Sequence, residues 1–292
     1  MNGFRSAPLW RGVAGRLDAV RMRPDVQGFT GAIVGFWSLL FPTECAVCGR
    51  LLIPLCPECL TAIRKATVRP LRVERGAPAL PQVPGRMESA TGFGDPLPVT
   101  AGGHYRSALA RLVLAYKNHH RTDVGRPLQT ALAGALHSAV EGLRQGGETA
   151  QILLVPVPAK GASLRRRGYD PLGLLLDGLV RRGELPAGCR PARLVGYRGI
   201  TVRLGSALAG RGGQQQQKGL GSAQRRANVR LTMTLRRGQH LVPGAVCLVV
   251  DDVLTTGATI AEVTRVLRLA GAEVAGAAVV AATEPPSRAE GM

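Results

Sequence analysis

Two neighbouring carboxylates, Asp251 and Asp252, are followed after two apolar residues by a Thr-Thr-Gly-Ala-Thr run. Successive backbone N–H groups at the beginning of a helix bind phosphate, and threonine hydroxyls add further donors. Carboxylates would repel a phosphate group, but they suit vicinal hydroxyls or a bridging Mg²⁺ ion. The stretch therefore predicts a site for a phosphorylated compound that carries hydroxyl groups. The predicted phosphate-binding turn consists of Thr255, Thr256, Gly257, Ala258 and Thr259.

An ordinary strand followed by an Asp- and Thr-rich helix cap is the alternative interpretation of this run, since both residue types favour caps. A cap explains one Asp or one Thr, but not two Asp and three Thr around a single Gly. Gly257 also suits a turn in which the backbone takes a positive φ and closely approaches a ligand. The pattern therefore favours a binding site.

The elements that must position this run are predicted by the apolar residues on both sides of it. Residues 246–250 are five consecutive apolar residues, too few for a helix, and indicate a strand that is buried on both faces and ends before the carboxylates. Ile260, Val263 and Val266 recur at helical spacing and predict a helix that ends near Gly271. Strand, acidic pair, turn and helix thus form one unit.

A second buried strand is expected over residues 151–158, where prolines end it. The loop after it carries Lys160, Arg165 and Arg167 before a helix that begins at Pro171. Cations at the carboxyl end of a parallel strand suit a second anionic group, and pyrophosphate is the natural candidate. A solvated helix start is the alternative, although cations are unfavourable at that end of the helix dipole.

Two Cys-x-x-Cys pairs, separated by seven residues, predict a structural zinc site. A module this small cannot bury enough surface to fold alone, so the metal must supply part of its stability. Disulfides and a redox pair are the alternatives. A reducing compartment disfavours the first, and a redox pair needs no second copy. The predicted ligands are Cys45, Cys48, Cys56 and Cys59.

The remaining segments predict the domain boundaries. Residues 1–35 form a basic N-terminal arm, 36–65 the zinc module and 66–103 a Pro- and Gly-rich linker or irregular loop. An α/β domain follows over residues 104–283, with a polar tail from 284 to 292.

Within the expected α/β domain, apolar spacing predicts helices from Leu109 to Lys117 and from about Pro127 to Leu143. A strand is expected near residues 193–195 and a last strand over 274–281. Lys117, at the end of its helix, is interpreted as a solvated cation, with a phosphate contact as the alternative.

The chain has a net charge of +19, and all but four of its 38 basic residues are arginines. This charge suits nucleic acid or polyphosphate partners, but codon usage explains it equally well. Aromatic residues make up 4 % of the chain, which argues against extensive base stacking. The apolar stretch 26–41 is shorter than the about 20 residues that span a bilayer, and no signal cleavage site follows it. A cytoplasmic location is expected.

The run from Asp251 to Thr259 resembles the phosphoribosyl diphosphate (PRPP) motif of type I phosphoribosyltransferases. The order of the motifs over about residues 36–283 resembles the ComF (GntX-like) family. That family's Arg-x-x-Thr-x-x-Gln run is interrupted here by Gly- and Gln-rich sequence before Gln217. The motifs are the four cysteines, Tyr105 through Lys117, Val155–Pro158 with Arg167-Gly168-Tyr169, Gln217 with Arg226 and Asn228, and the PRPP motif.

The resemblance implies a parallel sheet flanked by helices, of the type I phosphoribosyltransferase kind, after a small zinc-knuckle module. It makes Asp251 and Asp252 catalytic residues that bind the ribose hydroxyls, and it assigns the turn to the 5′-phosphate. The implied ligand is PRPP with Mg²⁺, and the implied reaction transfers a phosphoribosyl group and releases pyrophosphate. The alternative is a non-catalytic accessory factor in DNA uptake (competence) that binds PRPP or single-stranded DNA alongside DNA-uptake proteins.

Overall fold

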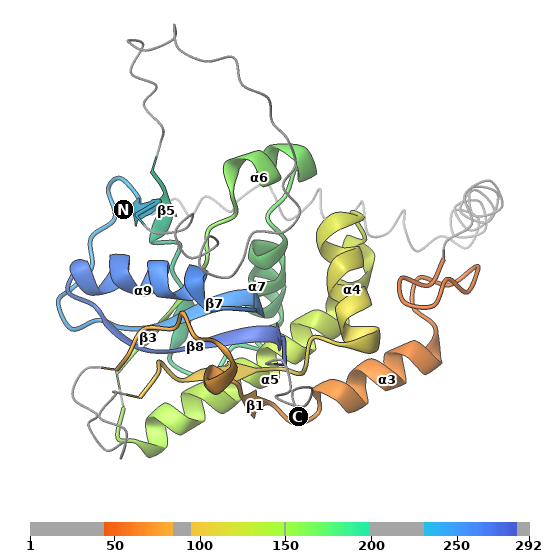
Figure 1. Ribbon diagram of the computed structural model, residues 1–292, viewed down its shortest axis with the longest axis horizontal. Helices are drawn as coiled ribbons and strands as arrows, with labels where there is room; N and C mark the ends of the chain where they lie inside the picture. Colours follow the sequence, from red (N-terminus) through yellow and green to blue (C-terminus); the bar gives the residue numbers. More distant parts are fainter. Residues whose placement is uncertain (1–43, 84–94, 149, 199–230, 285–292) are drawn as a thin grey trace, which may run out of the picture. The chain divides into compact units, whose positions relative to one another are not determined.

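The computed structural model describes residues 44–83, 95–148, 150–198 and 231–284. The chain divides into two compact units after Cys56. In the first unit, a bridge between Glu44 and Leu51 brackets the first cysteine pair. The second unit is an α/β domain built on a six-stranded sheet (Figure 1).

The sheet has the strand order β1-β2-β8-β7-β3-β4. Only the edge strand β1 is antiparallel to its neighbour, so the predicted parallel sheet is confirmed. The interior strands β3 and β7 are buried over their apolar residues, as expected for neighbouring parallel strands covered on both faces. The strands are β1 Leu71–Arg72, β2 Val99–Ala101, β3 Ile152–Pro156, β4 Cys189–Pro191, β7 Val246–Leu254 and β8 Glu273–Ala282.

Strand β7 runs through both aspartates to Leu254, so the prediction that it ends at Val250 was wrong. Its partner β8 is ten residues long and continues the ladder, pairing Asp251 with Val279 and Leu254 with Ala282. Two charged residues in sequence suggested a loop, but the long neighbouring strand supplies backbone partners on one side. The carboxylates therefore stand on a paired strand.

Helices cover both faces of the sheet (Figure 1). The parallel connections are expected to be right-handed, which puts α5 and α7 on one face and α9 on the other. Contacts agree, because α5 packs on β8, β2 and α7, while α9 packs on β7 and β8. The helices are α3 Pro57–Thr67, α4 Ser107–Asn118, α5 Gly125–Gln145, α6 Gly161–Arg167, α7 Pro171–Arg182 and α9 Ala258–Leu269, with short 3₁₀ turns at Glu74–Gly76 and Thr122–Val124.

The connections that leave β3 and β7 move in opposite directions along the sheet, and this reversal marks the place where a ligand site is expected. β3 leads into α7 on one face, whereas its neighbour β7 leads into α9 on the other. In open α/β sheets, ligands bind in the crevice outside the carboxyl ends of the strands at such a switch point.

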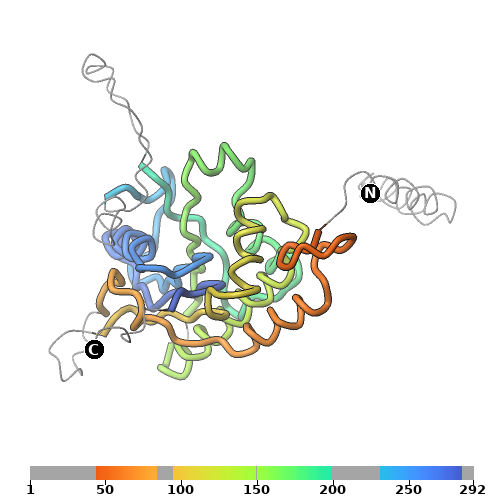
Figure 2. Tube along the Cα trace, turned by 45° about the vertical axis from the view of Figure 1, so that its right-hand side comes forward, coloured from red at the N-terminus to blue at the C-terminus, as the bar shows by residue number. Residues whose placement is uncertain are grey.

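The Pro- and Gly-rich segment 66–103 was predicted to be a linker or irregular loop. That prediction was wrong, because the segment contributes strands to this sheet. It contains β1 and β2, and Val99 pairs with Ala277 of β8. Because this partner lies far along the chain, no local pattern predicts it. Figure 2 shows part of the segment running beside α9, where Arg268 donates a hydrogen bond to the carbonyl of Gln82.

A two-stranded antiparallel ribbon, β5 Val195–Tyr197 with β6 Met233–Leu235, stands apart from the main sheet. A strand was expected at residues 193–195, whereas the chain forms β4 before this stretch and β5 at its end. The side chain of Glu262, on α9, accepts a hydrogen bond from the N–H of Met233, and Arg265 donates one to the Met233 carbonyl. These bonds join the ribbon to α9.

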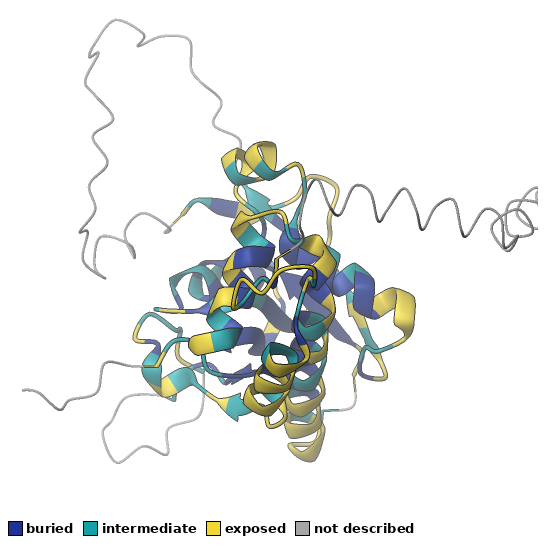
Figure 3. Ribbon diagram, turned by 90° about the vertical axis from the view of Figure 1, so that its right-hand side faces the viewer, coloured by how far each residue is buried: buried dark blue, intermediate teal, exposed yellow. Residues whose placement is uncertain are grey.

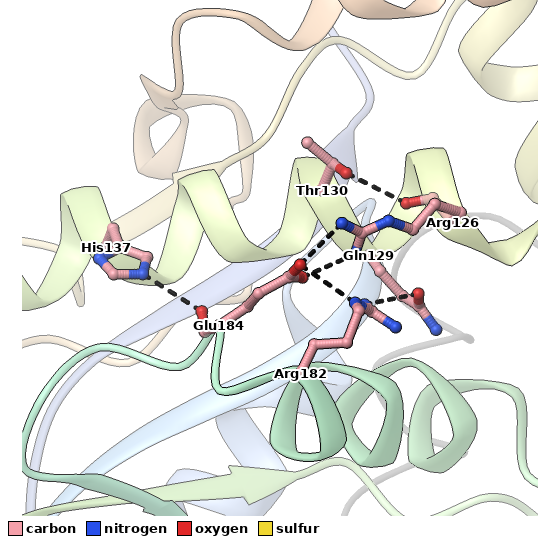
Figure 4. A network of polar contacts seen from close by, with 6 residues as sticks. All are labelled: Arg126, Gln129, Thr130, His137, Arg182 and Glu184. Carbon is pink, nitrogen blue, oxygen red and sulfur yellow. Dashed lines mark hydrogen bonds and ion pairs between the residues drawn. The ribbon is translucent and has the colours of Figure 1, made fainter.

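Buried residues concentrate in the sheet and on the helix faces turned toward it (Figure 3). An ion-pair network on the surface joins α5 to the end of α7 (Figure 4). Hydrogen bonds from Arg126 and Arg182 lower the pKa of Glu184 to about 2. Because these side chains are partly exposed, each pair contributes only about 0–1 kcal/mol. Among the described helices, none combines the length and apolar character that crossing a membrane requires.

The basic arm at residues 1–35, the start of the zinc module, the stretch 199–224 and the tail after Glu284 lie outside the described residues. The same holds for Gln217, Arg226 and Asn228.

Candidate functional site

A cleft of about 470 Å³ opens at the carboxyl ends of β3 and β7. Its acidic side is formed by Asp251 and Asp252, with Thr255 and Thr259 from the turn that follows. Its basic residues are Lys117, Lys160 and Arg167, from α4 and from the chain after β3. The predicted pairing of an acidic phosphate-turn unit with a basic segment is thus present in one cavity.

The two carboxylates are held close together and partly buried. Asp251 accepts a hydrogen bond from the backbone N–H of Asp252 at 2.8 Å. Burial, and then the neighbouring charge of Asp252, raise the pKa of Asp251 to about 8. The pair therefore disfavours two negative charges in the free protein, and a bound cation or hydroxyl donors would relieve that cost. This donor set fits Mg²⁺ or ribose hydroxyls.

Lys117 makes the shortest ion pair of the cleft. Its Nζ lies 2.6 Å from Oδ2 of Asp252. The interpretation of Lys117 as a solvated helix-end cation was therefore wrong. Helix spacing alone cannot show that the last turn of α4 reaches the carboxyl end of β7.

The turn after β7 has the geometry expected of a phosphate site, with one difference. Gly257 has a φ of +83°, as predicted. Among the described residues, no acceptor meets the N–H groups of Thr255, Thr256 and Gly257. A Cβ at Gly257 would lie 2.7 Å from the side chain of Leu80, so the close approach at this glycine is made by the protein's own chain. The carbonyl of Thr256 also accepts a hydrogen bond from the N–H of Ala79, and this bond helps to hold the turn in place.

The basic segment after β3 is a short helix, α6, where a loop was predicted. Its arginines occupy the last turn, where the helix dipole favours cations, so the predicted conflict with the dipole does not exist. Lys160 and Arg167 line the cleft, whereas Arg165 is exposed and not among the lining residues. Arg167 Nε is buried and has no hydrogen-bond partner among the described residues, which leaves a donor available to an anion.

Tyr105 and Tyr197 also line the cleft and were not predicted as site residues. Burial, and then the nearby charge of Asp251, raise the pKa of Tyr197. Tyr197 lies on β5, and no feature of the local sequence shows that this ribbon borders the cleft. Tyr105 was named from the sequence only as the first residue of the motif that ends at Lys117. This motif is the signal that could have placed Tyr105 in the site.

The four predicted cysteines form one cluster, with their Sγ atoms within 4.8 Å of one another. Sγ of Cys48 lies 3.7 Å from Sγ of Cys56. Two sulfurs bound tetrahedrally at about 2.3 Å from one ion would be about 3.8 Å apart. Burial opposes ionisation of Cys45, but hydrogen bonds from the backbone at Cys48 and Cys56 lower its pKa to about 6. The cluster could therefore bind a metal such as zinc. Cys247 is buried in β7, as predicted.

Replacing Asp251 with Asn is expected to stabilise the free protein at alkaline pH. The raised pKa of Asp251 favours folding at low pH, and this contribution is lost as pH rises from about 4, the unfolded value, to about 8. In buffer without divalent cations, the Tm of the variant should exceed that of the wild type by several degrees at pH 8.5 and by much less at pH 4.5. The measurement is thermal unfolding across this range.

Asp177→Asn is the matched control, because Asp177 is an exposed carboxylate that pairs with Arg193. An Asp251→Asn variant whose Tm difference is the same at both pH values would contradict the assignment of a protonated Asp251.

Comparison with known proteins agrees with the geometry of the cleft. The phosphoribosyl transferase domain family matches residues 206–290, which include the acidic pair and the turn. Competence protein F of Haemophilus influenzae is 29% identical over 175 residues, 59% of this chain and 66% of that protein. Orotate phosphoribosyltransferase of Pelotomaculum thermopropionicum is 52% identical over 48 residues, 16% of this chain and 25% of the enzyme. That of Desulforamulus reducens is 50% identical over 48 residues. The chain thus spans just under two thirds of the competence protein and a quarter of the enzymes.

Proposed function

We propose that this ComF-like protein of the phosphoribosyltransferase type binds PRPP together with Mg²⁺ in the cleft at the carboxyl ends of β3 and β7. One observation carries the proposal: the acidic pair, with Thr255 and Thr259 of the turn after it, shares a single cavity with Lys160 and Arg167. A ligand that carries hydroxyl groups and two phosphorylated ends matches the carboxylates, the turn and the basic residues that this cavity brings together. The phosphoribosyl transferase domain match supports the same ligand.

In a phosphoribosyl transfer, each group of residues in the cleft has a separate role. The turn from Thr255 to Thr259 holds the 5′-phosphate through backbone N–H groups and hydroxyls. Lys160 and Arg167 hold the pyrophosphate, whose negative charge grows as it leaves. Asp251 and Asp252 orient the ribose and stabilise the positive charge that develops on the sugar. Asp251 and Asp252 would supply carboxylate ligands to Mg²⁺, which when bound would neutralise negative charge on the pyrophosphate.

Pyrophosphate release tests whether transfer occurs. The protein with PRPP and Mg²⁺ is incubated with a panel of nucleobases and amines, and released pyrophosphate is measured. We expect one acceptor class to give release that depends on the protein and on Asp252. PRPP binding without release for any acceptor would favour the non-catalytic alternative, and absence of both binding and release would contradict the proposal.

A second candidate function is that of an accessory factor in DNA uptake that binds PRPP or single-stranded DNA and works alongside DNA-uptake proteins. The net charge of +19 and the likeness to a protein named competence protein F favour it. Phosphate contacts need no aromatic residues, so a low aromatic content does not oppose such binding. A cytoplasmic location stays a prediction under both functions.

If single-stranded DNA is a ligand, binding should be weak, independent of sequence and strongly dependent on salt. Arginines that neutralise at least six phosphates would release counterions, so affinity should fall about 10³-fold or more between 50 and 200 mM salt. Fluorescence anisotropy at several salt concentrations measures this slope.

Deleting residues 1–27, which carry five arginines, should reduce the salt slope and leave PRPP binding unchanged. An affinity that hardly changes with salt would mean that the charge is ordinary surface composition, and the DNA hypothesis would lose its support from the sequence.

A further inference from the structure

The ion pair between Lys117 and Asp252 places a cation directly on a carboxylate of the proposed ligand site. The Nζ–Oδ2 distance is 2.6 Å, and the side chains are 34% and 19% exposed. Partial burial excludes much of the water that weakens ordinary surface pairs. The lysine therefore neutralises Asp252 in the ligand-free cleft.

The backbone of Lys117 is held in place by the chain that follows β3. Arg167 Nη1 donates a hydrogen bond to the carbonyl of Lys117 at 3.4 Å, and the hydroxyl of Tyr169 donates one to the carbonyl of Tyr116 at 2.7 Å. The hydroxyl of Tyr116 in turn donates to the carbonyl of Pro171. The end of α4 is thus tied to α6 and α7, so a movement of Lys117 would be confined to its flexible, partly exposed side chain.

We propose that Lys117 is an internal counter-ion that occupies the cation position at Asp252 in the free protein and leaves it when Mg²⁺ and PRPP bind. This inference rests on the proposed function of the cleft. An ammonium group 2.6 Å from Oδ2 and a divalent cation coordinated by the same oxygen would repel each other at close range. The two cations therefore exclude each other on Asp252.

After displacement, the ammonium group of Lys117 can donate a hydrogen bond to the pyrophosphate group of PRPP, which is proposed to bind in the same cavity. Lys160 and Arg167, the proposed pyrophosphate ligands, line that cavity with it. Its ammonium group therefore exchanges a carboxylate for a pyrophosphate oxygen. The exchange makes binding of metal and phosphate cooperative, because a metal ion alone must displace the lysine without offering it a new anion.

Manganese binding tests the exclusion directly, with Mn²⁺ alone as the probe and electron paramagnetic resonance of the free ion as the readout. We expect Lys117→Met to bind Mn²⁺ about tenfold more tightly than the wild type does. Lys160→Met is the charge-matched control, because Lys160 lines the same cleft but makes no ion pair among the described residues. Its Mn²⁺ affinity should change less than threefold. Lys117→Arg, which keeps the cation, should behave like the wild type.

Pyrophosphate binding at saturating Mg²⁺ tests the second half of the exchange. Lys117→Met should weaken it about tenfold, although the same variant binds metal more tightly. Lys117→Gln serves if the Met variant does not fold, as judged by its thermal unfolding.

The proposal is overturned if neutral variants at position 117 bind Mn²⁺ no more tightly than Lys160→Met, or if neither these variants nor the wild type binds Mn²⁺. It is also overturned if pyrophosphate binding is unaffected. PRPP binding by the wild type is measured in parallel. Its absence contradicts the proposed function, whereas its presence with unchanged Mn²⁺ affinities contradicts only the role of Lys117.

Discussion

PRPP with Mg²⁺ should raise the Tm of the wild-type protein, and replacing both Asp251 and Asp252 with Asn should abolish the rise. A ligand at 100 times its Kd adds about 2.7 kcal/mol to the free energy of unfolding. For a domain of this size, that corresponds to a Tm increase of about 5–10 °C. The double variant lacks the carboxylates that we propose bind ribose hydroxyls or metal, so its Tm should not respond. Differential scanning fluorimetry over a PRPP titration measures both proteins.

The ligand-induced change must be referred to each variant's own ligand-free Tm, because removal of Asp251 is itself expected to stabilise the free protein. Asp177→Asn, outside the cleft lining, should retain the full response. A folded double variant that still responds fully to PRPP would show that the carboxylates hold neither ribose nor metal.

Purified protein should carry about one zinc ion per chain, and Cys45→Ser or Cys59→Ser should remove it. Structural zinc contributes about 10–16 kcal/mol of binding free energy in small modules, so its loss should unfold the cluster. Elemental analysis of protein prepared without chelator measures the metal, and limited proteolysis should show new cleavage within residues 44–59.

Cys189→Ser is the matched control, since Cys189 is a free, half-buried thiol outside the cluster. It should retain the zinc. A wild-type protein without zinc, in which the four clustered thiols are paired as disulfides, would contradict the assignment.

The sequence predicted the elements whose signals are local. The apolar run of β7 and the helical spacing of α9 and α5 each lie within one segment, and the structure confirms these elements. The four cysteines are also local, because the two ligands of each pair lie three residues apart.

Features set by distant partners were missed. β7 continues through Asp251 because β8 offers it a longer ladder, and β2 is a strand because of the same neighbour. Lys117 was assigned to solvent, since nothing near it in the sequence shows the carboxylate of Asp252. Arg165 was placed in the site with Arg167, but the helical turn of α6 leaves it off the cleft lining.

The ladder between β7 and β8 has a consequence for how such a protein can diverge. The carboxylates lie on a strand whose position is set by folding. The conformational entropy of orienting them is therefore lost on folding and does not oppose ligand binding. Other parts of the cleft come from α4, the α6 segment and the β5–β6 ribbon, which are separate stretches of chain. Substitutions in those stretches can change the rest of the cleft lining without disturbing the two carboxylates. An ancestral site of this design could acquire new acceptors, or lose catalysis and keep ligand binding, through changes outside the ladder alone.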